Sequence, residues 1–124
     1  MRIGILVLTL TAGLIAASTA VAKDREVVRK SGTCSKASTS KIKLSQEDGL
    51  IEVEFEVDQN RNGVRWVVVL KQRGRVVFQG TRATRAPSGS FELRRLLPDR
   101  SGPDAISARA TSPSGEVCRA AATF

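Results

Sequence analysis

The stretch LIEVEFEVD, residues 50–58, decides the fold class. Hydrophobic and acidic side chains alternate through it, so one set points to a core and the other to solvent. The hydrophobic set is Ile51, Val53, Phe55 and Val57, and the acidic set is Glu52, Glu54, Glu56 and Asp58. This period of two is typical of a strand with one buried face, and it indicates an antiparallel β-sheet.

The alternation continues on both sides of this stretch. After the polar turn at residues 60–63, a second strand would bury Trp66, Val68 and Leu70, and the two strands are expected to form a hairpin. The next strand, residues 75–81, has Val76 and Phe78 as core candidates. The remaining strands are expected at residues 26–34, around 42–44, and at 90–95, 104–111 and 116–124. The sequence therefore predicts an all-β fold, an antiparallel immunoglobulin-like β-sandwich of seven or eight strands.

The beginning of the chain has the pattern of a secretory signal peptide. Arg2 precedes a hydrophobic run that ends in Ala20-Val21-Ala22, a small-x-small cleavage site. Residues 1–22 could also serve as an uncleaved anchor, because about 20 apolar residues span a bilayer, but the polar residues within the run favour cleavage. We expect residues 23–124 to form a single domain that is secreted (extracellular) and does not insert into a membrane.

Two cysteines, Cys34 and Cys118, lie near the two ends of that domain. Export would place them in an oxidising compartment, where such pairs form disulfides. A redox pair or metal ligands are the alternatives, and the absence of histidine argues against a metal site. We expect a structural disulfide that joins the opening strand to the closing one.

Several segments together resemble a family of small exported bacterial proteins of unassigned function. These segments are Ser31-Gly32-Thr33-Cys34-Ser35, residues 51–58 leading through residues 60–63 to Trp66, residues 86–92, and Cys118-Arg119-Ala120. The resemblance covers most of the mature domain and implies a secreted immunoglobulin-like sandwich. It implies no activity, cofactor or catalytic residue.

An enzymatic function is not expected. The chain has no histidine and no tyrosine, and a disulfide would leave no free thiol, so the common general bases and nucleophiles are missing. Glu52, Glu54 and Glu56 could be read as a glycosidase-type carboxylate pair, but a flat solvated sheet offers no pocket to raise one pKa. Cross-strand pairing of these carboxylates with Arg65 and Lys71 is the preferred interpretation.

Residues 58–63 match the first half of a calcium-binding loop, with Asp58, Asn60 and Asn62 at alternate positions before Gly63. The match ends there, because Val69 occupies the position of the bidentate glutamate. Asparagine-rich turns also produce this pattern without a metal. No cofactor is predicted, and a weak calcium-binding module through Asp58 to Gly63 is kept as an alternative.

The preferred candidate site is a sheet face. If Trp66 and its alternate neighbours are buried, the opposite side carries an apolar strip with basic residues along it: Arg65, Val67, Val69, Lys71, Arg75 and Val77. A formal net charge of +8 agrees with an anionic partner.

We therefore expect a non-enzymatic binding domain that docks on a protein or an anionic polymer of the cell envelope. A structural extracellular protein with no specific ligand is the other alternative. Nucleic acid ranks below envelope material because the chain lacks exposed aromatic residues interleaved with its bases. The oligomeric state is not predicted.

Overall fold

The structure, a computed structural model, describes residue 4, residues 12–16 and residues 26–124. Most of the predicted signal peptide therefore lies outside the described residues. All regular structure in the described part of the chain is β. The strands are β1 (Val27–Ser31), β2 (Thr33–Cys34), β3 (Thr39–Glu47), β4 (Leu50–Asp58), β5 (Arg65–Gln72), β6 (Arg75–Ala83), β7 (Ser90–Pro98), β8 (Ala105–Thr111) and β9 (Val117–Thr123).

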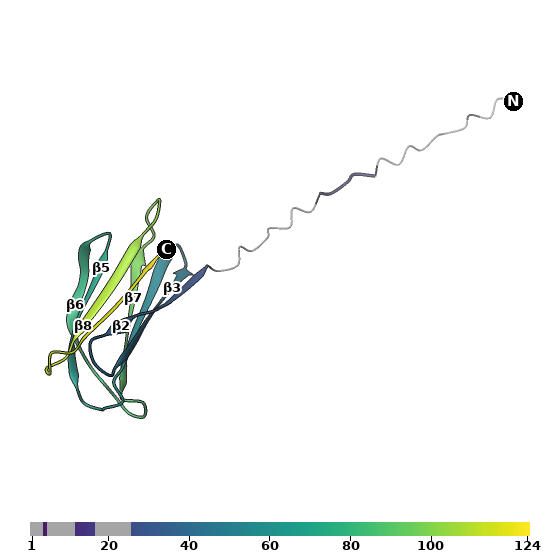
Figure 1. The fold of residues 1–124 in the computed structure, drawn as a ribbon. Coiled ribbons are helices and arrows are strands. Elements are labelled where there is room, and N and C mark those ends of the chain that lie inside the picture. Colours follow the sequence, from purple (N-terminus) through teal and green to yellow (C-terminus); the bar gives the residue numbers. More distant parts are fainter. Residues whose placement is uncertain (1–3, 5–11, 17–25) are drawn as a thin grey trace.

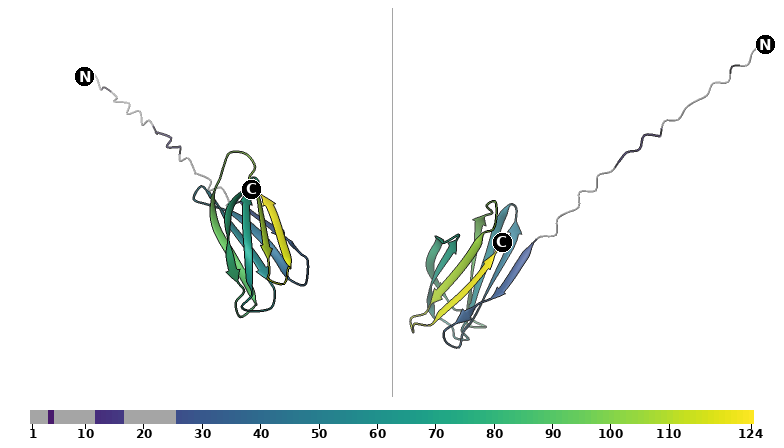
Figure 2. Two further views of the ribbon diagram at one scale, coloured as in Figure 1. Left: turned by 90° about the vertical axis from the view of Figure 1, so that its left-hand side faces the viewer. Right: turned by 45° about the horizontal axis from the view of Figure 1, so that its top comes forward.

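These strands form two antiparallel sheets packed face to face (Figures 1 and 2). Sheet A has the order β1-β3-β4-β7, and sheet B has the order β2-β9-β8-β5-β6. The hairpins β5–β6 and β8–β9 both lie in sheet B, while β7 between them returns to sheet A. This Greek-key path confirms the predicted immunoglobulin-like sandwich.

The first expected strand is divided at Gly32, where the chain crosses from sheet A to sheet B. Its amide donates a hydrogen bond to the carbonyl of Ser40. A Cβ atom at this position would collide with the carbonyl oxygen of Arg119 and the hydroxyl of Ser40, so only glycine fits. The division adds the two-residue strand β2 and accounts for nine strands among the described residues.

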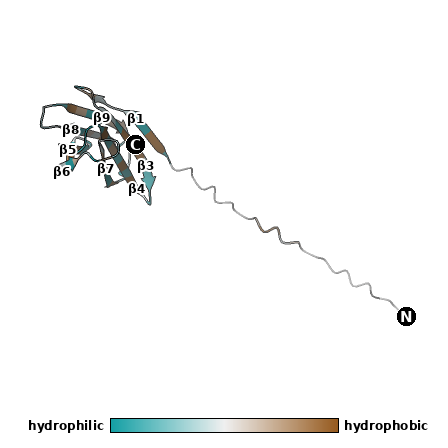
Figure 3. Cartoon of the chain, turned by 90° about the horizontal axis from the view of Figure 1, so that it is seen from below, coloured by the Kyte–Doolittle hydropathy of each residue, from teal (hydrophilic) through white to brown (hydrophobic). Residues whose placement is uncertain are grey.

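The core lies between the two sheets and contains the predicted inward sets except that of β6. Hydrophobic and hydrophilic residues are interleaved along the strands (Figure 3), as period-two burial requires. Phe91 packs edge-on against Phe55 and tilted against Trp66, with ring centroids 6.2 Å apart in both pairs. The indole N–H of the buried Trp66 donates to Oε1 of Gln59 at 3.1 Å, so its polar atom is satisfied.

The predicted hairpin between residues 50–58 and the following strand is wrong. β4 pairs with β3 and β7, and the linker after β4 carries the chain across to sheet B. Each strand has one apolar face, and placing the strands in opposite sheets buries these faces against each other. As a result, the carboxylates of β4 do not pair with Arg65 or Lys71.

The predicted orientations of Val76 and Val77 in β6 are also wrong, whereas Phe78 packs partly buried against the core as predicted. A β-bulge lies between Leu70 and Lys71: Leu70 is opposite Phe78 and Lys71 is opposite Val76, which leaves Val77 as the extra residue. Val76, expected in the core, is 54% exposed, whereas Val77, expected outside, packs partly buried against the core. The bulge shifts the alternation by one residue.

The side of the sandwich between β6 and β7 is closed by one aromatic side chain and two arginines. Phe78 lies over Gly80, and the guanidinium carbons of Arg82 and Arg95 are 5.1 and 4.8 Å from its ring centroid. Both arginines occupy inward positions, on β6 and β7. Inward-pointing charge on an edge strand hinders pairing with another chain.

The predicted disulfide between Cys34 and Cys118 is present and joins β2 to β9. Beside it, the buried carboxylate of Glu116 accepts hydrogen bonds from the amides of Lys36 and Ser38 and from the hydroxyl of Ser38. The disulfide and this carboxylate together hold the segment after β2 against the closing strand. A disulfide is compatible with the predicted export.

The carboxylate of Asp104 binds several groups at the end of sheet B opposite the disulfide. Its fully buried carboxylate accepts hydrogen bonds from the Arg100 amide, from Nε2 of Gln72 and from Nε of Arg73, at 2.8 to 3.1 Å. Burial alone would raise the pKa of Asp104, but these hydrogen bonds and the Arg73 charge outweigh it, and the pKa lies below its usual value.

Removing the disulfide should strongly destabilise the domain. The Cys34→Ser/Cys118→Ser variant should lose about 4.5 kcal/mol of unfolding free energy in urea, the chain-entropy value for so long a loop. The sequence separation of the two cysteines is 84. Wild-type protein with reductant should unfold like the variant, and a loss below about 1 kcal/mol would contradict the structural role.

Asp104 should make stability depend on acid pH. A carboxyl with a lowered folded-state pKa contributes stability above its unfolded value of about 3.9, and this is lost as the pH falls through the folded value. Asp104→Asn should lower the unfolding free energy at pH 7 by roughly 2 kcal/mol and flatten its decrease below about pH 5. Urea unfolding from pH 7 to pH 2 measures both, and parallel curves for the two proteins would refute this role.

Candidate functional site

The outer face of sheet B carries four basic side chains, which we call the basic face. Arg65 and Lys71 come from β5, Arg109 comes from β8, and Arg119 comes from β9. Alternation places them there, because their sequence neighbours Trp66, Leu70, Ala108, Ala110, Cys118 and Ala120 are buried in the core. All four cations are exposed.

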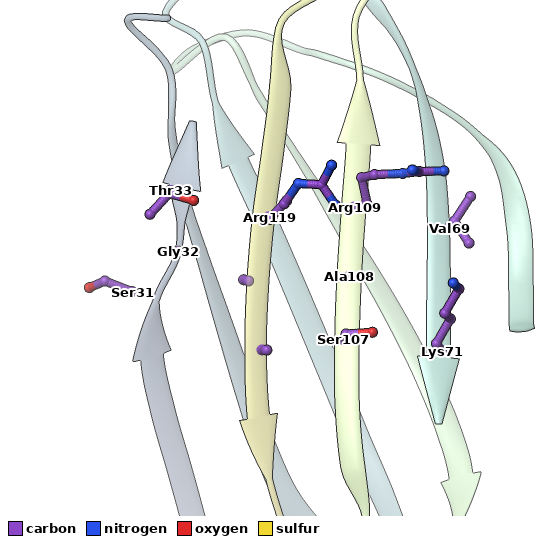
Figure 4. Close-up of a pocket in the computed structure, with 11 residues that line it drawn as sticks. Ser31, Gly32, Thr33, Val69, Lys71, Ser107, Ala108, Arg109 and Arg119 are labelled. Atoms are coloured by element: carbon purple, nitrogen blue, oxygen red, sulfur yellow. The ribbon is translucent and has the colours of Figure 1, made fainter. Parts of the chain in front are cut away.

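Strand register brings three of these cations together. Arg109 is directly opposite Arg119 on one side and Val69 on the other. Lys71 lies two residues further along β5, a diagonal neighbour of Arg109. In Figure 4, Arg119 points toward Arg109, Arg109 extends across the sheet toward β5, and Lys71 extends along β5 toward Val69.

No carboxylate of the described residues pairs with these cations. Where the structure describes the chain, the outward positions of β2, β9, β8, β5 and β6 contain no aspartate or glutamate. Ion pairs of the described residues lie elsewhere, among them Lys41–Glu56, Lys43–Glu54, Arg73–Asp104 and Arg94–Glu52. The basic face therefore has uncompensated positive charge.

The outer face of sheet A is the contrasting surface, because carboxylates of β4 lie beside cations of β3 and β7. Nη2 of Arg94 donates to Glu52 at 2.8 Å, and this hydrogen bond lowers the pKa of Glu52 in spite of its burial. Glu92 lies opposite Glu56 and has no ion pair among the described residues. Local desolvation, together with the charges of Glu54 and Glu56, raises the pKa of Glu92.

A shallow hollow of about 410 Å³ lies within the basic face. Lys71, Arg109 and Arg119 line it, and most of its other lining residues are small: Ser31, Gly32, Thr33, Val69, Ser107, Ala108, Ala120 and Ala121. Small side chains let a ligand approach the strand backbone closely. The hollow thus combines three cations with small side chains at its base, which leave space for a ligand above the sheet.

Four of the six predicted face residues lie on this surface. Arg65, Val67, Val69 and Lys71 alternate along β5, and Val67 is 48% exposed. The two on β6 do not join it: Arg75 lies at the β5–β6 turn opposite the buried Gln72, and Val77 packs toward the core because of the bulge. Val76, which lies opposite Lys71 and is exposed, takes the outward position that was expected for Val77.

The prediction missed Arg109 and Arg119. The signal was present, because an inward set of alternate alanines on residues 104–111 and 116–124 leaves these two arginines outward. What the sequence does not show is that β8 lies between β9 and β5, which brings the arginines beside Val69 and Lys71.

The calcium-loop candidates lie in a tight polar turn after β4. Asp58 accepts a hydrogen bond from the amide of Asn60, which has a φ of 56°, and Asn60 and Asn62 are exposed. Thr84 holds the loop, donating to the carbonyl of Arg61. This geometry is that of an Asx turn.

Potential metal ligands come together at one other place in the described ranges. Cys34, Glu116 and Cys118 have ligand atoms within 4.8 Å of one another. The two sulfur atoms are bonded to each other in the disulfide, which removes them as thiolate ligands.

No known protein family and no curated protein matches the chain. Among solved structures, chicken MD-1, in a crystal structure of its complex with lipid IVa, is similar to it at 12% sequence identity and a TM-score of 0.27. The alignment covers 80% of this chain and 99% of the MD-1 chain. This likeness assigns neither a family nor a ligand to the chain. The described part of the chain contains no helix that is long and apolar enough to cross a membrane.

The facing arginines should cost stability, because like charges directly opposite each other in a sheet repel. Arg119→Thr should raise the unfolding free energy by a few tenths of a kcal/mol in low salt, and about 0.5 M salt should abolish the gain. Arg65→Thr is the matched control, because Arg65 lies opposite Ala83. Urea unfolding at the two salt concentrations measures the effect, and equal changes in both variants would disprove the repulsion.

Proposed function

We propose that this chain is a non-enzymatic, exported binding domain whose basic face holds an anionic polymer of the cell envelope. The observation that carries the proposal is the segregation of charge. Sheet A balances its cations with carboxylates, whereas the outer face of sheet B has four cations and no described carboxylate. An unbalanced face of this kind attracts polyanions and concentrates them at its surface.

The chemistry of the face suits a polyanion. Three of the four cations are arginines, whose planar guanidinium groups can donate two parallel hydrogen bonds to one carboxylate, sulfate or phosphate group. Lys71 and Arg65 are six residues apart on β5, or roughly 20 Å along the strand. A single small ion cannot contact both, whereas an extended polymer lying along the sheet can.

The structure supports an anionic polymer more than a protein docked on an apolar strip. Protein interfaces have charge-depleted, hydrophobic centres. Here, Val69 is only partly exposed and lies directly beside Arg109, and Val77 is directed toward the core. The remaining exposed valines, Val67 and Val76, are not opposite each other in the register.

Nucleic acid is also less well supported. Binding to single strands relies on exposed aromatic side chains that stack on bases. Trp66, Phe55 and Phe91 are buried in the core, and Phe78 is flanked by two guanidinium groups at the β6–β7 side. The described basic face has no aromatic residue.

The non-enzymatic part of the proposal rests on the side chains present. The sequence has no histidine, and both cysteines are used in the disulfide. The carboxylates of β4 form ion pairs on the outside of sheet A. The export part rests on the predicted signal at residues 1–22 and on the disulfide.

Immobilised dextran sulfate and neutral dextran provide the test of the binding function. Wild-type protein should bind the sulfated polymer, with an affinity that falls steeply with salt, and should not bind neutral dextran. Arg109→Gln/Arg119→Gln should weaken binding about tenfold or more, the scale of losing one or two charge-assisted hydrogen bonds. The salt slope should fall by roughly 1.5.

Arg85→Gln/Arg100→Gln is the matched control, because both arginines are exposed, lie outside the basic face and carry the same total charge. This variant should lose no more than about threefold in affinity, the part due to net charge alone. Equal losses in the two double variants would show that the net charge binds the polymer and would refute a specific face. Absence of binding by wild-type protein would refute the function.

A further inference from the structure

We infer that the hollow among Lys71, Arg109 and Arg119 is a phosphate subsite, so that the polymer held by the basic face is phosphate-bearing and not carboxylated. This inference rests on the proposed function and specifies the charged group of the polymer that the basic face binds. It concerns the chemical group that enters the hollow, whereas the proposed function requires only that the face binds a polyanion.

The strand register places the three cations close together. Arg109 and Arg119 are on hydrogen-bonded strands and directly opposite each other, with backbones about 4.8 Å apart. Arg109 extends toward β5, and Lys71 extends along β5 toward Val69, which lies directly opposite Arg109 (Figure 4). All three line one hollow, so a single anionic group there can contact more than one of them.

The number of hydrogen-bond donors in the hollow favours a phosphate group over a carboxylate group. A carboxylate has two oxygens in one plane, and one guanidinium group satisfies both with parallel hydrogen bonds. Two adjacent guanidinium groups and an ammonium group offer many more donors than one carboxylate can accept. A phosphate group presents its oxygens tetrahedrally, so it can accept from both arginines and from Lys71 at once.

Hydroxyl groups add uncharged donors at the edges of the same hollow. Ser107 is directly opposite Lys71, and Thr33 is directly opposite Arg119. Both line the hollow, and neither hydroxyl donates a hydrogen bond to a carboxylate of the described residues. Hydroxyls of this kind commonly contact phosphate oxygens alongside arginine and lysine.

The small side chains at the base of the hollow leave space for a phosphate group. Ala121 lies on β9 directly opposite Ser107, and its side chain is exposed. Ala108, Ala120 and Gly32 complete the low surface beneath the cations. A larger side chain at Ala121 would therefore fill the hollow without altering the core or the net charge.

The experiment compares polyphosphate with poly-L-glutamate of similar charge at the same ionic strength, by isothermal titration. Wild-type protein should bind polyphosphate about tenfold or more tightly, because several charge-assisted hydrogen bonds distinguish the two polymers. Ala121→Leu should remove most of this preference and leave poly-L-glutamate binding nearly unchanged. Thr123→Leu, an exposed outward position further along β9 and outside the hollow, is the matched control and should behave as wild type.

A second variant separates the shape of the donors from their charge. Arg109→Lys/Arg119→Lys keeps the charge but loses both guanidinium forks, and it should lower the preference for polyphosphate to about threefold or less. Circular dichroism and urea unfolding should show that each variant folds.

The outcomes distinguish the two proposals. Equal binding of both polymers by wild-type protein would overturn the phosphate subsite and leave the proposed function standing. Binding of neither polymer would overturn both. Tighter binding to phosphatidylglycerol vesicles than to polyphosphate would assign the subsite to a lipid headgroup and overturn the polymer assignment.

Discussion

The packing of Trp66 and Phe55 on Phe91 between the two sheets is the contact on which the rest of the structure depends. These rings come from β5, β4 and β7, so they join sheet B to sheet A at the centre of the core. Because each strand has one apolar face, burying these faces turns the alternate residues outward on both sheets. The basic face is therefore a direct consequence of the core, since every cation on it lies next in sequence to a buried residue.

The two outer surfaces then differ in how their charges are arranged. On sheet A, Lys41, Lys43 and Arg94 lie opposite or beside carboxylates of β4 and form ion pairs of 2.8 to 3.7 Å. On sheet B, Arg109 and Arg119 lie opposite each other. Sheet A also has like charges opposite each other, Glu56 with Glu92, but Glu56 forms an ion pair with Lys41 as well. The repulsion between Arg109 and Arg119 has no described carboxylate to offset it, and such local costs occur where a surface serves a ligand and not only the fold.

Much of the fold could be predicted from alternation alone, because period-two burial marks strands wherever one face is covered. The Cys34–Cys118 disulfide followed from export and from the positions of the two cysteines. The β4–β5 hairpin was wrong because a short polar linker can equally turn within a sheet or cross between sheets. The predicted orientations of Val76 and Val77 were exchanged because a one-residue bulge depends on how two strands pair, which the local pattern of one strand does not show. Arg109 and Arg119 were readable as outward residues, but their grouping with Lys71 depends on strand order, which no local pattern contains.

The closed β6–β7 side affects how copies of this protein could bind side by side on one polymer molecule. A long polymer with repeated anionic groups offers many equivalent positions, so neighbouring copies would be brought to high local concentration. Sheets crowded in this way tend to fuse through their free edges into fibres. Arg82 and Arg95 around Phe78 place positive charge at the edges formed by β6 and β7, which disfavours fusion of neighbouring copies through this side.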